Sequence, residues 1–381
     1  MKKSGIKCFI GLFALVGYSQ GEPPSSALQN IAPPSSPAFV LMDITPSNIA
    51  TPDNIQAFSI QTISAFSGNS NGLANNNYAV EIQPYWYVKR EDMNFFKYNN
   101  LTTTKTSGIL TADDYTGYNI FGDLWKKASF SFAIMNNTFE VFEESHSYVS
   151  FGAKTRVITI RTIKEINELK SLYKKYSDFM GSSSVIAIMG NPLLTPDQLN
   201  EQIINLPKYK EIDEEFKNLV ERKPLFALDL AMAYSHFLGD KSLDFNDGFG
   251  RFGVWASGNL ALYAPRISKG SYVNIYGVFR YLRDGINMND NGILFTESKI
   301  DYGGKLEFEF SNLSFAYEYI TRDSDNNNES RSVGSIRYKI NDALTLNGGF
   351  GKNFMTESNN ITLFGLQWGF DKKSSVKLNP N

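Results

Sequence analysis

The chain has only two histidines, His146 and His236, and histidine is the side chain most often used for proton transfer near neutral pH. A serine hydrolase would need one of them within hydrogen-bond reach of a serine and of an acidic side chain. Ser235 precedes His236, but neighbouring residues of a β-strand point to opposite faces of the sheet. That pair therefore cannot react together. We expect a non-enzymatic protein whose histidines belong to loops or to an aromatic belt.

Two further motifs resemble ligand sites. Residues 248–253 read GFGRFG, but a dinucleotide site needs a strand before the glycines and a helix after them, and here a strand is predicted after them. Asn287, Asn289, Asn291 and Gly292 resemble a calcium loop, yet the first position lacks Asp and the twelfth is Ser298, not Glu. We therefore interpret the glycines as sites where a strand bends or packs against the interior and the asparagines as a surface loop, and we expect no cofactor and no metal.

Charged side chains form the third group, because they recur at alternate positions of several segments, opposite apolar residues. A polar face of this kind is typical of the interior of a membrane β-barrel. It would line an aqueous path or fill a closed lumen with ion pairs, and about twelve strands leave room for either. The candidate lumen-lining residues are Glu81, Lys154, Arg156, Asp229, Arg251, Arg280, Lys299, Asp301, Lys305, Glu307 and Arg337.

Eleven segments alternate in this way, and with 9–14 residues each they are long enough for the roughly 9–11 residues that a tilted membrane strand needs. In residues 297–310, for example, Ile300 and Tyr302 share one face while Lys299 and Asp301 share the other. A soluble β-sandwich would alternate too. Aromatic strand ends and very unequal turns favour the barrel. The segments are 78–89, 128–136, 148–161, 225–237, 250–262, 271–283, 297–310, 313–322, 330–340, 343–352 and 361–370.

Turn lengths predict the topology. Short turns at 311–312 and 341–342 are expected on the periplasmic side, and long segments such as 284–292 outside. Both chain ends should be periplasmic, which requires an even number of strands, so we expect a twelfth strand at residues 106–119. The predicted fold is all-β: an antiparallel transmembrane β-barrel of about twelve strands with a small α-helical periplasmic insertion.

Residues 162–223 form that insertion, because their apolar residues recur at helical spacing. Thr195 and Gln198 form a capping box with Pro196 at the first helical position. Alternating charges, as in residues 208–217, are typical of a solvated helix face. The insertion either docks a partner or plugs the barrel, or it is a small addition that packs on the rim.

The chain ends have their own character. Residues 1–21 combine early lysines, a short apolar run and small residues, as a secretory signal peptide does. Cys8 lies inside this segment, so the mature chain has no thiol. Residues 22–77 are expected to be a periplasmic leader with a short helix at 53–66, and the barrel to occupy 78–370 before a tail at 371–381. After the signal segment no apolar run is long enough for a membrane-spanning helix.

Several strings resemble a known group of proteins. Residues 36–41 (SPAFVL), 78–81 (YAVE), 84–86 (PYW) and 127–133 (KASFSFA) are similar to uncharacterised outer-membrane β-barrel proteins of Bacteroidetes-like Gram-negative bacteria. In the last predicted strand, alternate apolar residues ending at Phe370 resemble the C-terminal recognition motif of bacterial outer-membrane proteins, although the tail follows it. The resemblance implies the cell outer membrane, with lipid and the outer-membrane assembly machinery as partners.

Composition narrows the remaining functions. With 20% charged residues and a net charge of −2, no nucleic-acid partner is expected. We expect porin-like passage of small polar solutes. The alternative is a structural or secretion-associated barrel whose periplasmic helices bind a protein of the envelope, and a membrane-embedded hydrolase is a third, weaker hypothesis.

Overall fold

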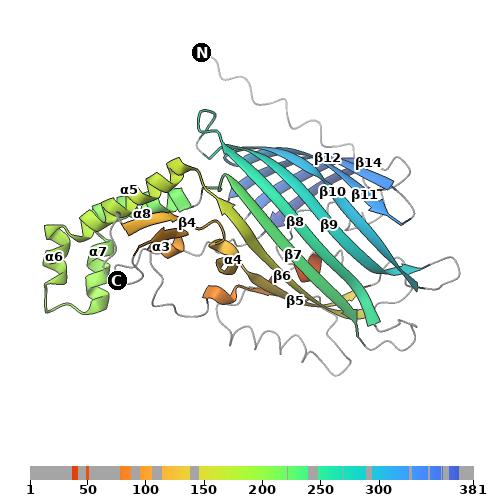
Figure 1. Cartoon of the computed structure of the whole chain (residues 1–381), viewed down its shortest axis with the longest axis horizontal. Helices are drawn as coiled ribbons and strands as arrows, with labels where there is room; N and C mark the ends of the chain where they lie inside the picture. The colour runs from red at the N-terminus through yellow and green to blue at the C-terminus, as the bar shows by residue number, and fades with distance from the viewer. Residues whose placement is uncertain are drawn as a thin grey trace, which may run out of the picture.

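The computed structural model describes residues 37–41, 49–50, 78–86, 95–104, 114–137, 146–220, 222–238, 248–268, 270–288, 294–325, 328–341, 344–352, 354 and 360–368. Most of them form one strongly curved β-sheet with a group of helices at one end (Figure 1). Neighbouring strands are antiparallel except for the first pair, which is parallel. In spatial order the strands are β1 Ile49–Ala50, β2 Tyr78–Ile82, β5 Ser129–Asn137, β6 His146–Ile160, β7 Phe226–Phe237, β8 Phe249–Tyr263, β9 Tyr272–Met288, β10 Leu294–Phe310, β11 Leu313–Ser324, β12 Asn328–Asn341, β13 Leu344–Lys352 and β14 Asn360–Trp368.

The predicted strand segments correspond to β2 and β5 to β14, so the prediction of a large antiparallel sheet is confirmed. The tight turn between β10 and β11 contains Ser311, whose φ of 53° lies in the left-handed region. Among the described residues, no pairing joins β14 to β1 or β2, and these strands form the two edges of the sheet. Strand pairing among the described residues therefore does not close the sheet into a barrel.

The described part of the expected twelfth strand, residues 114–119 of 106–119, is not a member of this sheet. Of its described part, Tyr115–Tyr118 forms β4, which pairs with β3 (Leu101–Thr103) in a separate two-stranded sheet. The parity argument that required this strand assumed that the chain enters the sheet from the helical end. In the structure β2 starts at the opposite end, since Tyr78 pairs with Ile134 near the end of β5. Because β2 starts at the end of the sheet opposite to the one where β14 ends, an odd number of antiparallel strands is consistent and no hidden strand is required.

Several element bounds also differ from expectation. The first predicted strand ends at Ile82 and is followed by a 3₁₀ turn, η2 (Pro84–Trp86), because proline cannot continue a strand in the interior of a sheet. β9 continues to Met288, so Asp284 is a strand residue and not the start of a loop. The predicted signal peptide 1–21, the helix 53–66, the asparagines 289 and 291, Phe370 and the tail 371–381 lie outside the described residues.

Four helices form the segment between β6 and β7, as the helical period of 162–223 predicts. They are α5 Ile163–Met180, α6 Ser183–Met189, α7 Pro196–Ile204 and α8 Pro207–Val220. The predicted capping box of α7 is confirmed: the Gln198 backbone N–H donates to Thr195 Oγ1 over 3.4 Å and the Thr195 N–H donates to Gln198 Oε1 over 3.0 Å. A second capping box, Thr162 with Glu165, starts α5.

The helices share one apolar core with an earlier segment of the chain. α3 (Phe95–Tyr98) and β3 contribute Phe96 and Leu101, which pack with Leu169, Ile212 and Phe216. We call residues 95–104, 114–118 and 163–220 together the helical domain. The short helix α4 (Asp123–Lys126) lies between this domain and the sheet and contacts β6 (Figure 1).

A short N-terminal helix, α1 (Pro37–Val40), packs against β5, β6 and β7. It lies on the same face as the charged residues, because the Ala38 N–H donates to Ser131 Oγ over 3.1 Å and Arg251 Nη1 donates to the Leu41 carbonyl over 3.3 Å. Gly152 allows this approach, since a Cβ there would lie 2.6 Å from the Ala38 nitrogen. Part of the predicted periplasmic leader thus contacts the concave face of the sheet.

Candidate functional site

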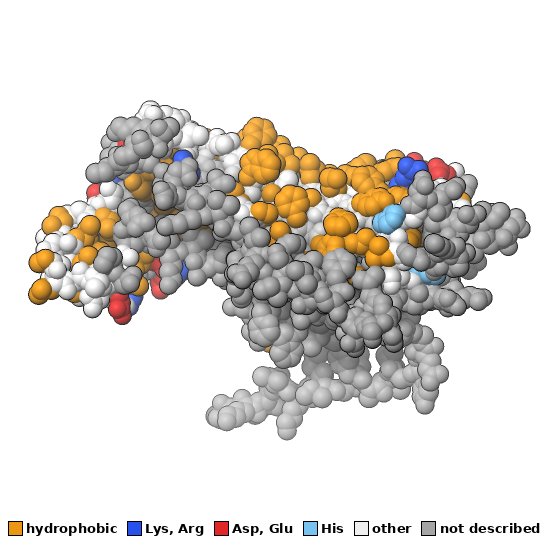
Figure 2. Space-filling model, turned by 90° about the horizontal axis from the view of Figure 1, so that it is seen from below, with side chains coloured by type: hydrophobic (Ala, Val, Ile, Leu, Met, Phe, Trp, Pro, Cys, Tyr) orange, Lys and Arg blue, Asp and Glu red, His pale blue; other side chains and the backbone are white. Residues whose placement is uncertain are grey.

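The two faces of the sheet have opposite polarity. On β10, Asp301 is 0% exposed, whereas the next residue, Tyr302, is 50% exposed. The same contrast recurs on β8, β9, β11 and β12, where Arg251, Arg280, Glu318 and Arg331 are buried on the concave face, and large apolar groups are exposed on the convex face of most long strands. Figure 2 shows hydrophobic side chains gathered over part of the strand region. Exposed examples are Phe151, Met232, Phe279, Phe308, Phe315, Tyr317, Tyr319 and Ile336.

This arrangement is the reverse of that in a water-soluble sheet, where charged residues are almost never fully buried without partners and apolar residues turn inward. Buried charges require an opposite charge and hydrogen bonds, because desolvation costs several kcal/mol per ion. The partners of the concave-face charges therefore decide what this surface can do.

All eleven candidate lumen-lining residues lie on the concave face, and each belongs to an ion pair. The structure does not gather them into one cluster but distributes them along β2, β6 to β10 and β12. The pairs and their N···O distances are Lys154–Glu81 2.9 Å, Arg156–Asp229 2.7 Å, Arg251–Asp284 2.8 Å, Lys299–Glu297 2.9 Å, Arg322–Asp301 2.7 Å, Lys305–Glu307 3.9 Å and Arg337–Glu307 2.9 Å, together with Arg280–Asp301.

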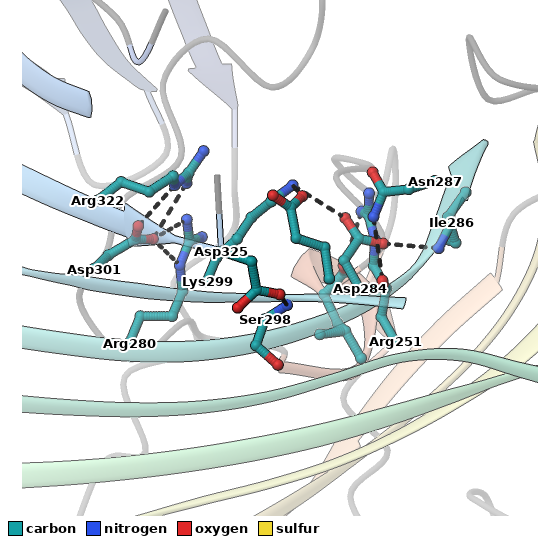
Figure 3. A network of polar contacts seen from close by, with 12 residues as sticks. Arg251, Arg280, Asp284, Ile286, Asn287, Ser298, Lys299, Asp301, Arg322 and Asp325 are labelled. Atoms are coloured by element: carbon teal, nitrogen blue, oxygen red, sulfur yellow. Dashed lines mark hydrogen bonds and ion pairs between the residues drawn. The ribbon is translucent and has the colours of Figure 1, made fainter. Parts of the chain in front are cut away.

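The most deeply buried of these groups is a triad on β9, β10 and β11, in which two arginines share one aspartate (Figure 3). Asp301 accepts hydrogen bonds from Arg280 Nε at 2.6 Å and from Arg322 Nε at 2.7 Å and Nη2 at 3.2 Å. The three residues sit on adjacent strands at the same level, so the strand register itself brings them together: Asp301 is paired with Arg280 on one side and Arg322 on the other. One carboxylate therefore neutralises part of two guanidinium charges.

A second cluster, around Asp284, is drawn beside the triad in Figure 3 and lies near the end of β9 at Met288. Asp284 accepts from Arg251 Nε at 2.8 Å and from the Ile286 backbone N–H at 3.0 Å, and Lys299 Nζ lies 3.8 Å away. Because Arg251 also donates to Leu41, this cluster joins the wall of the sheet to α1. The N-terminal segment is thus anchored to the concave face through a buried arginine.

Phe354, which follows β13, also packs on the concave face. Its ring lies 3.8 Å from the guanidinium carbon of Arg322 and contacts the buried Val278 and Ile320. A cation–π contact of this kind holds a desolvated arginine by its flat face. Phe354 and α1 are therefore two segments outside the strands that occupy the concave side.

Sequence reasoning missed several members of these clusters, namely Asp284, Glu297, Glu318, Arg322 and Arg331. Asp284 and Arg322 have the same strand parity as the residues that were predicted, which was the available signal. Asp284 was missed because the strand was ended one residue too early. Arg331 and Glu318 form a further buried pair at 3.3 Å, on β12 and β11.

The histidines and the glycine motif have structural surroundings. Ser235 is buried and accepts from the Arg251 N–H at 2.7 Å, while His236 points to the other face and lies 3.3 Å from the Tyr234 hydroxyl, as the alternation of strand residues predicts. His146 is the first residue of β6 and not a loop residue. Gly250 to Gly253 belong to β8, and a Cβ at Gly250 would lie 2.6 Å from Ser235 Oγ, so strand packing explains this glycine.

Comparison of the chain with protein-family models, with curated proteins and with solved structures found no match. No helix within the described ranges is both long enough and apolar enough to cross a membrane. Within the same ranges, no group of three His, Cys, Asp or Glu side chains is arranged to hold a metal ion. The assignment of a function therefore depends on the geometry of the sheet and its charges.

Proposed function

We propose that the sheet closes in an outer membrane as a β-barrel that passes small polar solutes in the manner of a porin. One observation carries this proposal: the concave face buries charges as deeply as Asp301, while the convex face exposes residues such as Phe279 and Tyr302. A convex face of this composition would be poorly hydrated in water, but it matches the lipid-facing band of an outer-membrane barrel.

The polar concave face then lines the solute path. Its ion pairs run between neighbouring strands, as Arg280, Asp301 and Arg322 do, so they line the wall. With α1 and Phe354 on the same face, the path is narrow, which favours small solutes. If the short turns, such as that at residues 311–312, face the periplasm, the helical domain lies at the periplasmic mouth of the barrel.

Two measurements test the proposal in order. Purified full-length protein should migrate differently on a gel before and after boiling, because folded barrels resist detergent. In planar bilayers it should produce discrete current steps. Absence of a gel shift would contradict the barrel hypothesis. A clear shift without any current would support the barrel and contradict the pore.

The alternative, a structural or secretion-associated barrel with an envelope partner, has one observation in its favour. The far end of the helical domain exposes Ile186, Met189 and Leu193, the last to 87%. A photo-crosslinker at Leu193 in intact cells should then capture one discrete envelope protein, and a crosslinker at the exposed Lys210 should not. Equal labelling from both positions would remove this alternative.

A further inference from the structure

A cavity of about 460 Å³ lies where the helical domain meets the concave face of the sheet. Its walls come from the turn after α3, from α4, from the end of β6, from the connection between α8 and β7, and from β7, β8 and β9. This volume falls within the usual range for small-molecule sites, about 300–1,000 Å³. If the proposed pore is correct, every solute that crosses it passes this cavity at the periplasmic mouth. We call it the vestibule.

The vestibule is strongly cationic. Six basic residues line it, against two carboxylates, Asp123 and Asp229. The basic residues are Lys126, Lys127, Arg156, Arg161, Arg222 and Lys223.

Four of these cations have acidic partners. Lys126 lies 3.4 Å from Asp123, and Arg156 lies 2.7 Å from Asp229. Arg222 pairs with Glu168 at 2.6 Å, and Lys223 pairs with Glu309; neither of these two glutamates is part of the vestibule wall. Within the described part of the chain, Lys127 and Arg161 have no carboxylate partner. Two positive charges therefore remain after all the pairs are counted.

Both carboxylates of the vestibule already have partners within its wall. Asp123 accepts from Thr159 Oγ1 at 2.6 Å and from Asn100 Nδ2 at 2.8 Å, in addition to its pair with Lys126. Burial raises the pKa of Asp123, but the hydrogen bonds from Thr159 and Asn100 and the charge of Lys126 outweigh it, so the pKa falls below its usual value. Asp123 therefore stays ionised, and its hydrogen-bond and ion-pair partners are Lys126, Thr159 and Asn100 rather than Arg161.

One polar atom in the wall also lacks a partner. Asn259 Oδ1 is buried and accepts no hydrogen bond among the described residues. Buried polar side chains nearly always have a partner, so this atom offers an acceptor to any donor inside the vestibule. The surplus positive charge favours an anion, and the acceptor favours one that also carries a hydroxyl.

We propose that the vestibule binds small free oxyanions, carboxylates or phosphates, on their way through the proposed pore. The planar guanidinium of Arg161 can donate two parallel hydrogen bonds to a carboxylate or phosphate, and Lys127 adds a second positive charge. A hydroxyl on the same solute would satisfy Asn259. Hydroxylated organic acids and hydrogen phosphate have this combination of groups.

Binding is tested on the purified full chain in detergent, without added lipid, by calorimetric titration of inorganic phosphate and of malate at low salt. The double variant Lys127→Gln with Arg161→Gln should bind about tenfold more weakly, which corresponds to about 1.4 kcal/mol. A matched control, Lys174→Gln with Lys210→Gln, removes the same charge from exposed positions of α5 and α8 outside the vestibule and should bind like the parent chain. Arg161→Lys, which keeps the charge, should recover part of the affinity if the charge itself matters.

Folding of each variant is checked by its heat-dependent gel migration. The proposal is overturned if the parent chain shows no saturable binding, or if the control loses as much affinity as the vestibule variant. Bilayer recordings separate this result from the fate of the pore: in a KCl gradient the parent should prefer Cl⁻ and the vestibule variant should lose that preference. Binding without any current leaves the site standing and removes the pore; current without binding does the opposite.

Discussion

The helical domain and the strand sheet of this chain bury opposite kinds of side chain. In the helical domain Leu169, Ile212 and Phe216 form the core, and pairs such as Lys175–Glu215 lie at the surface. In the sheet, charges such as Asp301 are buried and residues such as Phe279 are exposed. One sequence therefore follows two patterning rules. The proposed outer-membrane barrel would account for this difference by two solvents, water around the helices and lipid around the strands.

The largest effect is expected at the triad, where the inside of the sheet is most unlike the inside of the helical domain. Asp301→Ala leaves the buried Arg280 and the partly buried Arg322 without their shared carboxylate and should destabilise the protein by about 3–5 kcal/mol. Asp323→Ala, an exposed aspartate of β11, is the matched control. Denaturant unfolding of the protein in lipid vesicles measures both. Equal stability of the two variants would mean that the triad is solvated and that the two interiors do not differ as described.

A slightly smaller loss is expected in the helical core. Leu169→Ala removes a buried side chain and should cost about 2–5 kcal/mol, the range for such cavities. Leu193→Ala makes the same chemical change at an exposed position and should cost little. Circular dichroism at 222 nm follows the helices during unfolding. If the two substitutions changed the free energy of unfolding equally, Leu169 would not belong to an apolar core of the helical domain.

The third substitution tests the solvent on the outside of the sheet. Phe279 lies near the middle of β9 on the convex face, and Phe279→Lys should cost about 2–4 kcal/mol in a lipid bilayer, as lysine does near the midplane. Phe121→Lys, at an exposed turn near α4, should be nearly neutral. Vesicle-inserted protein is compared by denaturant titration with gel migration as the readout. A convex face in contact with water would tolerate both lysines.

The alternation of apolar and polar residues predicted the strands, because residues two positions apart in a strand lie on the same face of the sheet. In β10 this gave both the exposed Tyr302 and the buried Asp301 from the sequence alone. The rest depends on contacts between distant segments. Nothing near Phe96 or Leu101 indicates that they complete the core of helices that begin only at Ile163, and Pro37–Leu41 carry no charge or period that would predict packing against Gly152 and Arg251.

The expected strand at 106–119 failed for a related reason. The prediction was made from a count of crossings and not from the residues themselves, whose alternation is poor. Tyr115 and Tyr118 instead pack against the core of the helical domain as part of a small separate sheet. Asp123 and Arg161 belong to the vestibule for the same non-local reason, since a helix, a strand end and a loop converge there.

The smallest expected effect concerns the pH response of the helical domain. Burial, with smaller contributions from Tyr209 and Tyr173, raises the pKa of Tyr176 to about 12 from its model-compound value of 10.0. The folded domain therefore favours the protonated phenol. The stability that this provides is fully present below pH 10 and is lost as the pH rises from 10 toward 12, because the unfolded chain releases the proton first.

Tyr176→Phe removes the titrating group and should make the helical domain less sensitive to pH in that interval, while Tyr302→Phe on the convex face serves as the control. Helical circular dichroism in moderate denaturant, followed from pH 9 to pH 12, measures the difference. The strands should change less than the helices over the same range if the sheet is embedded in lipid and the helical domain is in water. Loss of both signals at one pH, with no change on removal of Tyr176, would show that the two regions unfold as a single unit and share one environment.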